Sequence, residues 1–430
     1  MKFREYLSQL DSEGKLTRIR EAVSPRYEIP ALLRKHEGKP IFFENVDGST
    51  IPVSGNLVSS MDLLCESLRI RKDEWIARLD SAMSNPGAIR EGRGDFEYFE
   101  PDLDLLPILT HYPKDQGAYV TAAVVFAQRG GLRNISFHRL CKMGKDRLVG
   151  RLVEKRDLDT MYLDAREHGE DLHVSIGIGN SSGVLVAGAT SVGRGVYELG
   201  IAAALENGIE VTKAKTNVTS YPVDTEIVLE GRILHDESAP EGPFVDLTNT
   251  YDVVRVQPVF AIDRLAMRKT PVYHALLPGG NDHRILMGAP RTPTIYRALR
   301  EAGLDVKNVH LTEGGSGWLD AVIAIEKKSE ADPRTAIDAA IKGHRSLKKI
   351  TIVDGDVDVT NPNEVNYAVT MYWEAGKEVV MRGAKGSSLD PMATPDGIGS
   401  KLAIDATRPL IVPVERELKM RKAEPVPDVG

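Results

Sequence analysis

The sequence predicts an α+β fold with several domains, in which a strand-rich centre is flanked by two regions that mix helices and strands. The chain has 430 residues and a mass of 47.2 kDa, enough for two or three domains that each bury a core. Short β-runs dominate from about residue 106 to 300, whereas helical and strand patterns alternate beyond about 301. We therefore predict domains over residues 1–105, 106–300 and 301–430.

The N-terminal region, residues 1–105, combines short helical patterns with short strands. Helices are predicted over residues 60–69 and 72–84, and a strand over 40–44. The stretch 86–93 is rich in glycine and charge, which is typical of a surface loop. This region is therefore predicted to be of the α/β kind.

The central region is dominated by short β-runs, of which residues 171–177 and 253–257 are examples. One amphipathic helix is predicted near 196–206, with Gly208 as the residue that ends it. So many strands with so few helices favour a barrel.

The C-terminal region alternates strands with helices, which indicates an α/β domain. Strands are predicted over 309–312, 321–326 and 350–353. Helices are predicted over 333–347, where proline occupies the first turn, and over 363–373.

Composition excludes several classes of protein. With 55 basic and 62 acidic residues the formal net charge is −7 and the pI about 5.9, which argues against a general nucleic-acid binder. No apolar run approaches the roughly 20 residues that cross a bilayer, and the opening MKFRE lacks the apolar core of a signal peptide. We therefore expect a cytoplasmic protein whose two cysteines, Cys65 and Cys141, are reduced.

Two carboxylates, Glu241 and Asp246, lie five residues apart around a stiff turn. Pro243 fixes its own φ, Gly242 permits a close backbone approach, and the strand-like run 226–233 leads into the turn. Two carboxylates close together cannot both ionise cheaply, so one of them can hold a proton and act as a general acid. The alternative is a solvated loop with ordinary surface acids.

A second segment of interest follows the β-rich run 119–127 and consists of a glycine turn and a further strand. Period-two alternation places Asn134, Ser136 and His138 on one face of that strand and Arg139 on the other. An amide oxygen can ligate a hard cation, and an arginine can clamp a carboxylate through two parallel hydrogen bonds. Either residue could instead be buried and satisfied by the backbone.

Three motifs together resemble the UbiD family of reversible decarboxylases. They are N-x-S-x-x-R at 134–139, E-G-P-x-x-D at 241–246 and GSKLAIDAT at 399–407, and they occur in the family's order and with similar spacing. The resemblance implies a split β-barrel like that of flavin reductases for the centre, and a C-terminal α/β domain that makes homo-oligomer contacts. It also implies prenylated FMN as cofactor, made by a separate flavin prenyltransferase and held by Mn²⁺ (or Mg²⁺) and often K⁺.

The resemblance assigns metal ligands. It makes Asn134 and Glu198 ligands of the divalent ion, whose oxygen donors suit magnesium or manganese. Where the family often has a histidine this chain has Asp157, a carboxylate that is still a competent ligand. Without the resemblance, Glu198 would be an exposed acid in the first turn of a helix.

The resemblance also assigns the residues that contact the cofactor. Lys401 follows the glycine-rich turn 396–400, whose amides can cradle a phosphate, and it matches the family's lysine that reaches the cofactor phosphate. The alternative for Lys401 is a solvated side chain. The other implied contacts are Ser136, Phe137, His138, Arg139, Arg151, Leu152, Val153 and Arg156.

The chemistry implied is the loss of CO2 from an unsaturated carboxylic acid. That step leaves negative charge on an sp2 carbon, which no side chain can delocalise, so a cofactor must act as electron sink. By resemblance Arg139 holds the departing carboxylate, Asp246 protonates the carbon, and Glu241 links Arg139 to Asp246.

The identity of the acid is left open by the sequence. A phosphorylated acid would need further cations, whereas an aromatic acid of the polyprenyl hydroxybenzoate type would need an apolar pocket. A flavin-binding protein without decarboxylase activity is the third alternative. The cations available for a phosphate are Arg264, Arg268, His274, His283 and Arg284.

Overall fold

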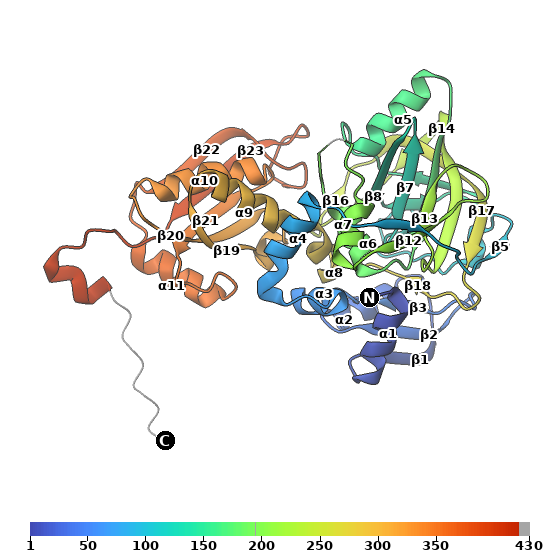
Figure 1. Cartoon of the computed structure of the whole chain (residues 1–430), viewed down its shortest axis with the longest axis horizontal. Helices are drawn as coiled ribbons and strands as arrows, with labels where there is room; N and C mark the ends of the chain where they lie inside the picture. The colour runs from blue at the N-terminus through green and yellow to red at the C-terminus, as the bar shows by residue number, and fades with distance from the viewer. Residues whose placement is uncertain (194, 421–430) are drawn as a thin grey trace. The chain divides into compact units, whose positions relative to one another are not determined.

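The structure is a computed structural model that describes residues 1–193 and 195–420, and it divides into two compact units, Met1–Pro293 and Thr294–Gly430. Helices and strands alternate irregularly in the first unit and regularly in the second (Figure 1), so the predicted α+β architecture with several domains is confirmed. The further division of the first unit near residue 105 stays a prediction.

The first unit opens with helices around a small sheet of order β1-β2-β3-β18. The predicted strand at 40–44 is present as β2, and the predicted helices at 60–69 and 72–84 are present as α3 and α4. Strand β18 comes from far along the chain and pairs in parallel with β3. The elements are α1 (Phe3–Ser12), β1 (Thr17–Val23), α2 (Glu28–Lys35), β2 (Ile41–Val46), β3 (Val53–Gly55), α3 (Met61–Leu68), η1 (Lys72–Glu74), α4 (Trp75–Ser84) and β18 (Tyr273–His274).

The centre of the first unit is a nine-stranded sheet of order β6-β9-β10-β17-β14-β11-β7-β8, with β5 paired to β17. This path runs from β6 to β8 without closing among the described strands, so the predicted split barrel is not confirmed. The strands are β5 (Glu97–Phe99), β6 (Tyr119–Val120), β7 (Val124–Arg129), β8 (Leu132–Phe137), β9 (Leu140–Lys142), β10 (Arg147–Gly150), β11 (Leu172–Ile178), β14 (Ile227–Glu241) and β17 (Arg255–Met267).

Both faces of this sheet are buried, because alternate residues along its strands enter two different cores. Val125 and Ile176 pack on one face with α5, while Val124 and Phe126 pack on the other with α6 and α7. The helices are α5 (Asp157–Glu167), α6 (Ser182–Ala189) and α7 (Leu199–Leu205) (Figure 1). The predicted helix at 196–206 is α7, and Gly208 follows it at φ 112°.

Smaller elements complete the first unit. A three-stranded sheet has the order β13-β12-β4, and a two-stranded hairpin joins β15 to β16. Their bounds, with the remaining short helices, are β4 (Ile89–Glu91), η2 (Leu103–Leu105), β12 (Ile209–Lys213), β13 (Ser220–Pro222), β15 (Phe244–Val245), β16 (Tyr251–Asp252) and α8 (Asn281–Gly288).

The second unit contains a five-stranded sheet of order β19-β20-β21-β23-β22, in which the three inner strands are parallel. Its predicted strands and helices are present, although the helix predicted to reach residue 347 ends at Gly343. The elements are β19 (Asp305–Leu311), η3 (Glu313–Gly315), β20 (Asp320–Glu326), α10 (Asp332–Gly343), β21 (Lys349–Asp354), α11 (Pro362–Tyr372), β22 (Glu378–Lys385), β23 (Ile398–Asp405) and η4 (Val414–Met420), while α9 (Arg291–Glu301) begins just before the unit. Within residues 1–193 and 195–420, no helix is long and apolar enough to cross a membrane.

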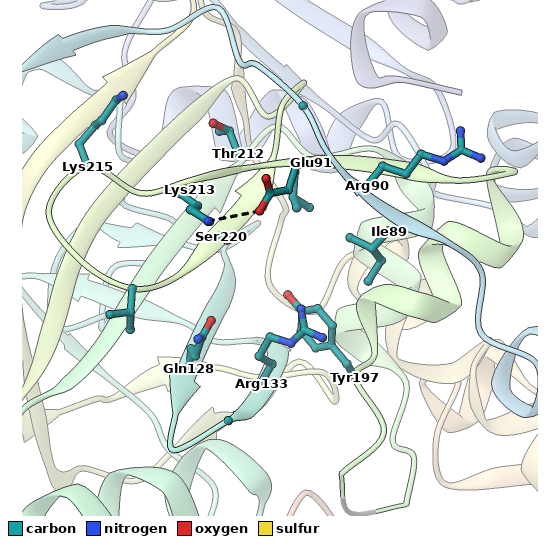
Figure 2. A pocket seen from close by; sticks show the side chains of 14 residues that line it. Ile89, Arg90, Glu91, Gln128, Arg133, Tyr197, Thr212, Lys213, Lys215 and Ser220 are labelled. Carbon is teal, nitrogen blue, oxygen red and sulfur yellow. Dashed lines mark ion pairs between the residues drawn. The ribbon is translucent and has the colours of Figure 1, made fainter.

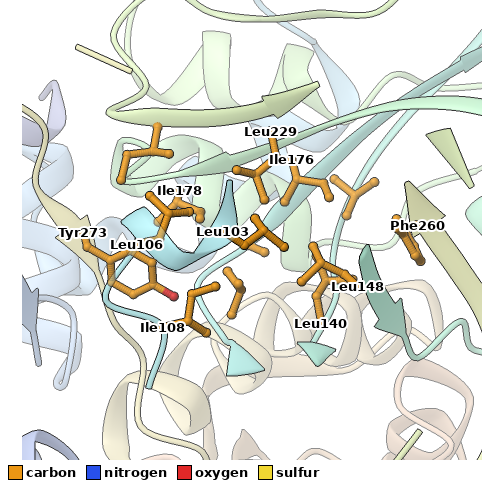
Figure 3. Packing of buried hydrophobic residues seen from close by; sticks show 14 of the residues in the cluster. Leu103, Leu106, Ile108, Leu140, Leu148, Ile176, Ile178, Leu229, Phe260 and Tyr273 are labelled. Atoms are coloured by element: carbon orange, nitrogen blue, oxygen red, sulfur yellow. The ribbon is translucent and has the colours of Figure 1, made fainter. Parts of the chain in front are cut away.

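A buried tyrosine allows a test of the core between the two sheets of the first unit. Tyr273 is 1% exposed among aliphatic side chains (Figure 3), and within the described residues its hydroxyl has no hydrogen-bond partner. Because an unpaired buried hydroxyl costs about 1–3 kcal/mol, Tyr273→Phe should leave the free energy of unfolding unchanged or raise it by about 1 kcal/mol. Equilibrium urea unfolding measures this change.

Tyr221 is the matched control, because it is equally buried but its hydroxyl donates to Glu230 Oε1 at 2.8 Å. Tyr221→Phe should lower the free energy of unfolding by about 1–3 kcal/mol, since Glu230 loses a donor. Equal losses in the two variants would mean that Tyr273 has a hydrogen-bond partner in solution.

Candidate active site

Arg139 lies between β8 and β9, and three carboxylates hold its guanidinium. Nε and Nη2 donate to the two oxygens of Glu241, both at 2.9 Å, in the bidentate geometry predicted for this arginine. Nη1 donates to Asp246 Oδ2 at 2.8 Å, and Nη2 also donates to Asp252 Oδ2 at 2.9 Å. The predicted residues Arg139, Glu241 and Asp246 are therefore in direct contact.

The turn that carries Glu241 and Asp246 is built to bring its backbone close to the neighbouring strand. Glu241 ends β14 with 0% exposure, and Tyr119 donates its hydroxyl to Glu241 Oε1 at 3.2 Å. Gly242 has φ 99°, and a Cβ there would lie 3.1 Å from the carbonyl oxygen of Val253, so this position requires glycine. Glu241 is thus a buried residue and not the surface acid of the alternative interpretation.

Asp252 is a member of this cluster that sequence reasoning missed. Strand β16 places it, because β16 pairs with β15 immediately after the Gly242–Pro243 turn. Burial acts to raise the pKa of Asp252, but the hydrogen bonds and charges of Arg255 and Arg139 outweigh burial and lower it. No motif marks Asp252; only the pairing of the hairpin brings it to Arg139.

The three carboxylates differ in exposure. The side chain of Glu241 is 0% exposed, whereas those of Asp246 and Asp252 are 22% and 18% exposed. Asp246 lines a hollow together with Arg139, and neither Glu241 nor Asp252 is among its lining residues. Asp246 is therefore the one carboxylate of the three that is both partly exposed and part of the wall of the hollow.

The hollow next to Arg139 has a volume of about 150 Å3. Six of the predicted site residues line it, namely Phe137, His138, Arg139, Arg151, Val153 and Asp246. Its other walls are mostly apolar and come from Thr121, Ala189, Phe244, Leu276, Pro278, His283, Leu286 and Met287. Of the five cations considered for a substrate phosphate, only His283 is among these lining residues.

Asn134 and Glu198, the two residues predicted to be ligands of one ion, form a buried pair. Each is 4% exposed, and Asn134 Nδ2 donates to Glu198 Oε1 at 2.8 Å while the Ile135 N–H donates to Oε2 at 3.0 Å. Glu198 does precede α7, as the alternative supposed, but it is buried. Burial raises the pKa of the Glu198 carboxyl to about 7, and the charge of Asp157 adds to the rise.

The hydrogen bonds around Asn134 leave its oxygen available to a cation. Ser136 Oγ has one proton and lies 3.0 Å from Asn134 Oδ1 and 2.9 Å from His138 Nε2. Burial lowers the pKa of His138 to about 4, so the ring is neutral, and Nδ1 donates to the carbonyl of Arg151 at 2.8 Å. Nε2 must then accept the Ser136 proton, which leaves the lone pairs of Asn134 Oδ1 without that donor.

The oxygen donors around Asn134 suit a hard divalent cation, although they are few in number. The described residues contain no group of three histidine, cysteine, aspartate or glutamate side chains arranged for a metal. The oxygen donors present are the amide oxygen of Asn134 and the carboxylate of Glu198. Asp157 is near enough for its charge to raise the pKa of Glu198. Oxygen ligands of this kind are those that Mg²⁺ and Mn²⁺ prefer.

Four predicted cofactor contacts lie outside the lining of the hollow. Ser136 Oγ donates to His138 Nε2 at 2.9 Å, the Leu152 N–H donates to Gln257 Oε1 at 2.8 Å, and Arg156 Nη1 donates to Ser191 Oγ at 3.4 Å. The fourth, Lys401, is 5% exposed in the second unit, so it is not a solvated side chain. Its ammonium donates to the main-chain carbonyls of Arg345 and Leu347, and its contact with a cofactor phosphate stays a prediction.

A wider groove of about 670 Å3 lies elsewhere in the first unit, between β4, β12 and the β7–β8 hairpin (Figure 2). Arg133 stacks 4.3 Å from the centroid of the Tyr197 ring there, and Lys213 pairs with Glu91 at 3.2 Å. None of the predicted site residues lines this groove. The smaller hollow is the better candidate, because apolar walls and interacting titratable groups meet in it.

Acidic and basic side chains meet apolar walls in this hollow, and the Ser136–His138 hydrogen bond connects it to the buried Asn134–Glu198 pair, an arrangement typical of enzyme active sites. Family models match three successive parts of the chain. They are described as the N-terminal domain (residues 7–83), the Rift-related domain (86–281) and the C-terminal domain (284–406) of 3-octaprenyl-4-hydroxybenzoate carboxy-lyase.

Individual relatives agree with the family models. The chain is 40% identical over 413 residues to anhydromevalonate phosphate decarboxylase of Methanothermobacter thermautotrophicus, a match that covers 95% of this chain and 97% of that protein. The UbiD-class enzyme HmfF from Pelotomaculum thermopropionicum, solved with FMN, superposes with a TM-score of 0.95 at 35% identity, over 100% of this chain and 98% of that one. An evolved dimeric HmfF, solved with prFMN, gives a TM-score of 0.89 at 33% identity, over 98% of both chains. The chain belongs to the UbiD family of carboxy-lyases.

The raised pKa of Glu198 gives a test of the metal site. The carboxyl is neutral well below pH 7, so its stabilising contribution is complete below the ordinary glutamate pKa and is lost as the pH rises through about 7. A divalent ion needs the ionised form, so Mn²⁺ should raise the melting temperature by several degrees at pH 8 and hardly at all at pH 5. Thermal melts of metal-free protein with and without Mn²⁺ measure this.

Asn134→Ala and Glu198→Gln should both abolish the response to Mn²⁺, and Asp157→Ala should reduce it by a similar or smaller amount. Glu206→Gln is the matched control, because burial also raises the pKa of Glu206 to about 7 but this side chain bonds to Gly183 N and Ser181 Oγ. A full response in both Asn134→Ala and Glu198→Gln would show that the ion binds elsewhere.

Proposed function

We propose that this protein is a non-oxidative decarboxylase that uses prenylated FMN to convert trans-anhydromevalonate phosphate to isopentenyl phosphate and CO2 in isoprenoid biosynthesis. The observation that carries the proposal is the contact of Arg139 with Glu241 and Asp246 at the wall of the hollow. The identity of 40% with an enzyme of that name supports the choice of substrate.

Prenylated FMN, when bound, supplies the electron sink that the loss of CO2 requires. Asn134 and Glu198, with Asp157 nearby, are the residues that would hold Mn²⁺ or Mg²⁺ next to the flavin phosphate. We also propose that a K⁺ ion helps to hold the cofactor and that Lys401 contacts its phosphate. The available oxygen of Asn134 and the raised pKa of Glu198 support a cation at this place. The HmfF complexes with FMN and prFMN support the flavin.

Arg139 binds and orients the substrate carboxylate. Four of the five N–H groups of its guanidinium donate to acids in the contacts described, so a carboxylate that binds both N–H groups of Nη1 takes the place of Asp246 there. Glu241 keeps its bidentate bonds at 2.9 Å and Asp252 its bond to Nη2, which holds the guanidinium plane still. The arginine is thereby preorganised, and little side-chain entropy is lost when substrate binds.

Asp246 delivers the proton once CO2 has left. It lines the hollow, whereas Glu241 is buried and fixed by the Tyr119 hydroxyl. A substrate carboxylate on Arg139 Nη1 frees Asp246 from that contact, so its side chain can turn toward the reacting carbon. The walls from Phe244, Leu276 and Leu286 are apolar, which favours proton delivery by the side chain over delivery by water.

The wider setting of the enzyme is part of the same proposal. We propose that the nine-stranded sheet belongs to a split barrel and that the C-terminal domain makes homo-oligomer contacts. We also propose that a flavin prenyltransferase supplies the cofactor and that the protein is cytoplasmic.

Mass spectrometry of the bound cofactor tests the flavin: full activity with unmodified FMN would contradict it. CO2 release from trans-anhydromevalonate phosphate, compared with release from polyprenyl hydroxybenzoate, tests the substrate.

Asp246→Asn should lower turnover by about 100-fold or more, the scale of positioned acid–base catalysis, because the amide cannot donate the proton. Single-turnover kinetics on trans-anhydromevalonate phosphate, with CO2 and product followed separately, should show CO2 release ahead of product formation. In D2O the wild type should place deuterium on the carbon that lost CO2.

Asp263→Asn is the control, since Asp263 pairs with Arg232 and does not line the hollow. It should retain wild-type rates. Wild-type rates in both phases for Asp246→Asn would assign proton delivery to Glu241 instead, and Glu241→Gln should damage activity in either case because Arg139 loses its bidentate partner.

A further inference from the structure

His283 is a wall residue of the hollow whose hydrogen bonding the proposed function leaves unused. It lines the hollow together with Arg139 and Asp246. The main-chain N–H of Gly279 donates to its Nδ1 at 3.1 Å. A neutral imidazole has one N–H group, and because Nδ1 accepts a hydrogen bond, that N–H group is on Nε2.

The ring of His283 is neutral near pH 7, and its Nε2–H is available to a ligand. Burial lowers the pKa of His283, the charges of Arg139 and Arg284 lower it further, and the charge of Asp246 opposes them only in part. In the part of the chain that the structure describes, the ring bonds to the Gly279 N–H, and no acceptor bonds to Nε2. The side chain therefore offers one donor, in a fixed tautomer, at the wall of the site.

Contacts with distant segments hold the start of α8, the helix that carries His283. The Asn281 N–H donates to Glu37 Oε1 at 2.8 Å. The next residue, Asp282, accepts the Val58 N–H at its Oδ1 at 2.9 Å, and this hydrogen bond is buried. A donor on a helix that is fixed in this way is preorganised for its ligand.

The segment before α8 packs directly against the residues that carry Asp246. Gly279 has φ 66°, and a Cβ there would lie 3.1 Å from the main-chain oxygen of Asp246, so this position requires glycine. The charges of Arg139 and Asp246 both affect the pKa of His283. His283 therefore lies at the end of the hollow where the carboxylate of the substrate reacts.

We propose that the Nε2–H of His283 donates a hydrogen bond to the substrate carboxylate while Arg139 binds the same group. The inference rests on the proposed function, and it gives the reacting end a second donor from a different element. Asp246 already takes one of the two N–H groups of Arg139 Nη1, so the guanidinium alone offers a carboxylate few free donors. His283 supplies one for which no carboxylate of residues 1–193 and 195–420 competes.

A neutral donor suits a reaction in which the bound group loses its charge. The carboxylate leaves as CO2, which is neutral, so a cationic partner stabilises the starting acid more than the departing CO2. A neutral N–H donor orients the carboxylate without adding charge–charge attraction to the starting acid. We therefore assign His283 to the carboxylate and not to a cationic site for the substrate phosphate.

The deciding variant is His283→Asn, prepared as holoprotein after co-expression with a flavin prenyltransferase. The asparagine side chain can still accept the Gly279 N–H, but it does not extend to the position of Nε2. The KM for trans-anhydromevalonate phosphate should rise by about 10-fold or more, since a hydrogen bond to a charged group is lost, and kcat should change less than KM. In single turnovers, CO2 release and product formation should stay in step, because Asp246 is unchanged.

Two further variants complete this test. His283→Gln, whose amide reaches the position of Nε2, should recover part of the loss in KM. His168→Asn is the control and should behave as the wild type, because His168 has a side chain that is 61% exposed and does not line the hollow.

Two ligands that do not react separate the carboxylate from the phosphate as the anion that His283 binds. Flavin absorbance measures their binding to the holoprotein. His283→Asn should bind 3-methylbutanoate about 10-fold more weakly than the wild type does, and it should bind isopentenyl phosphate equally well. Weaker binding of isopentenyl phosphate with unchanged binding of 3-methylbutanoate would overturn the proposal.

Three other results would overturn it as well. They are a wild-type KM in His283→Asn, product formation that lags behind CO2 release, which would assign His283 to Asp246, and a loss of flavin, which would assign it a structural role. If wild-type holoprotein does not act on trans-anhydromevalonate phosphate, the proposed function fails by itself. Binding of 3-methylbutanoate then tests His283 alone: weaker binding to His283→Asn supports the proposal, whereas equal binding, or no binding to the wild type, overturns it.

Discussion

The ion-pair network of Arg139 is the interaction on which the rest of the site depends. A guanidinium stays charged at every accessible pH, so a buried one needs anions, and Glu241, Asp246 and Asp252 provide them from the turn after β14 and from β16. Removal of the Arg139 guanidinium would leave the fully buried Glu241 carboxylate uncompensated, which typically costs several kcal/mol. The network thereby holds together the loop between β8 and β9, the loop between β15 and β16, and the end of β14.

The long antiparallel pair β14–β17 explains how the acids reach Arg139. Its register shifts between Ile233 and Ser238, after which the strands remain paired until Glu241 lies opposite Arg255. Arg255 in turn binds Asp252 at 2.7 Å. Such an irregularity bends and twists a strand, and the carboxyl end of β14 is carried with it toward the loop of Arg139.

The sequence predicted the helices with clear 3.6-residue periodicity, the α/β pattern of the second unit, and the three residues Arg139, Glu241 and Asp246, because each depends on local spacing. It did not predict Asp252. This residue meets Arg139 across 113 positions of sequence, and no local pattern encodes such a contact. The burial of Lys401 was missed for the same reason, since its partners Arg345 and Leu347 come from another loop.

Around Arg139 and Arg255, three carboxylates face two guanidiniums. A substrate carboxylate that binds both N–H groups of Arg139 Nη1 competes with Asp246 for one of them, which weakens binding at the reacting end. Contacts with the rest of the substrate can offset that cost, and binding energy gained away from the reacting bond then holds the carboxylate in the position from which CO2 is lost.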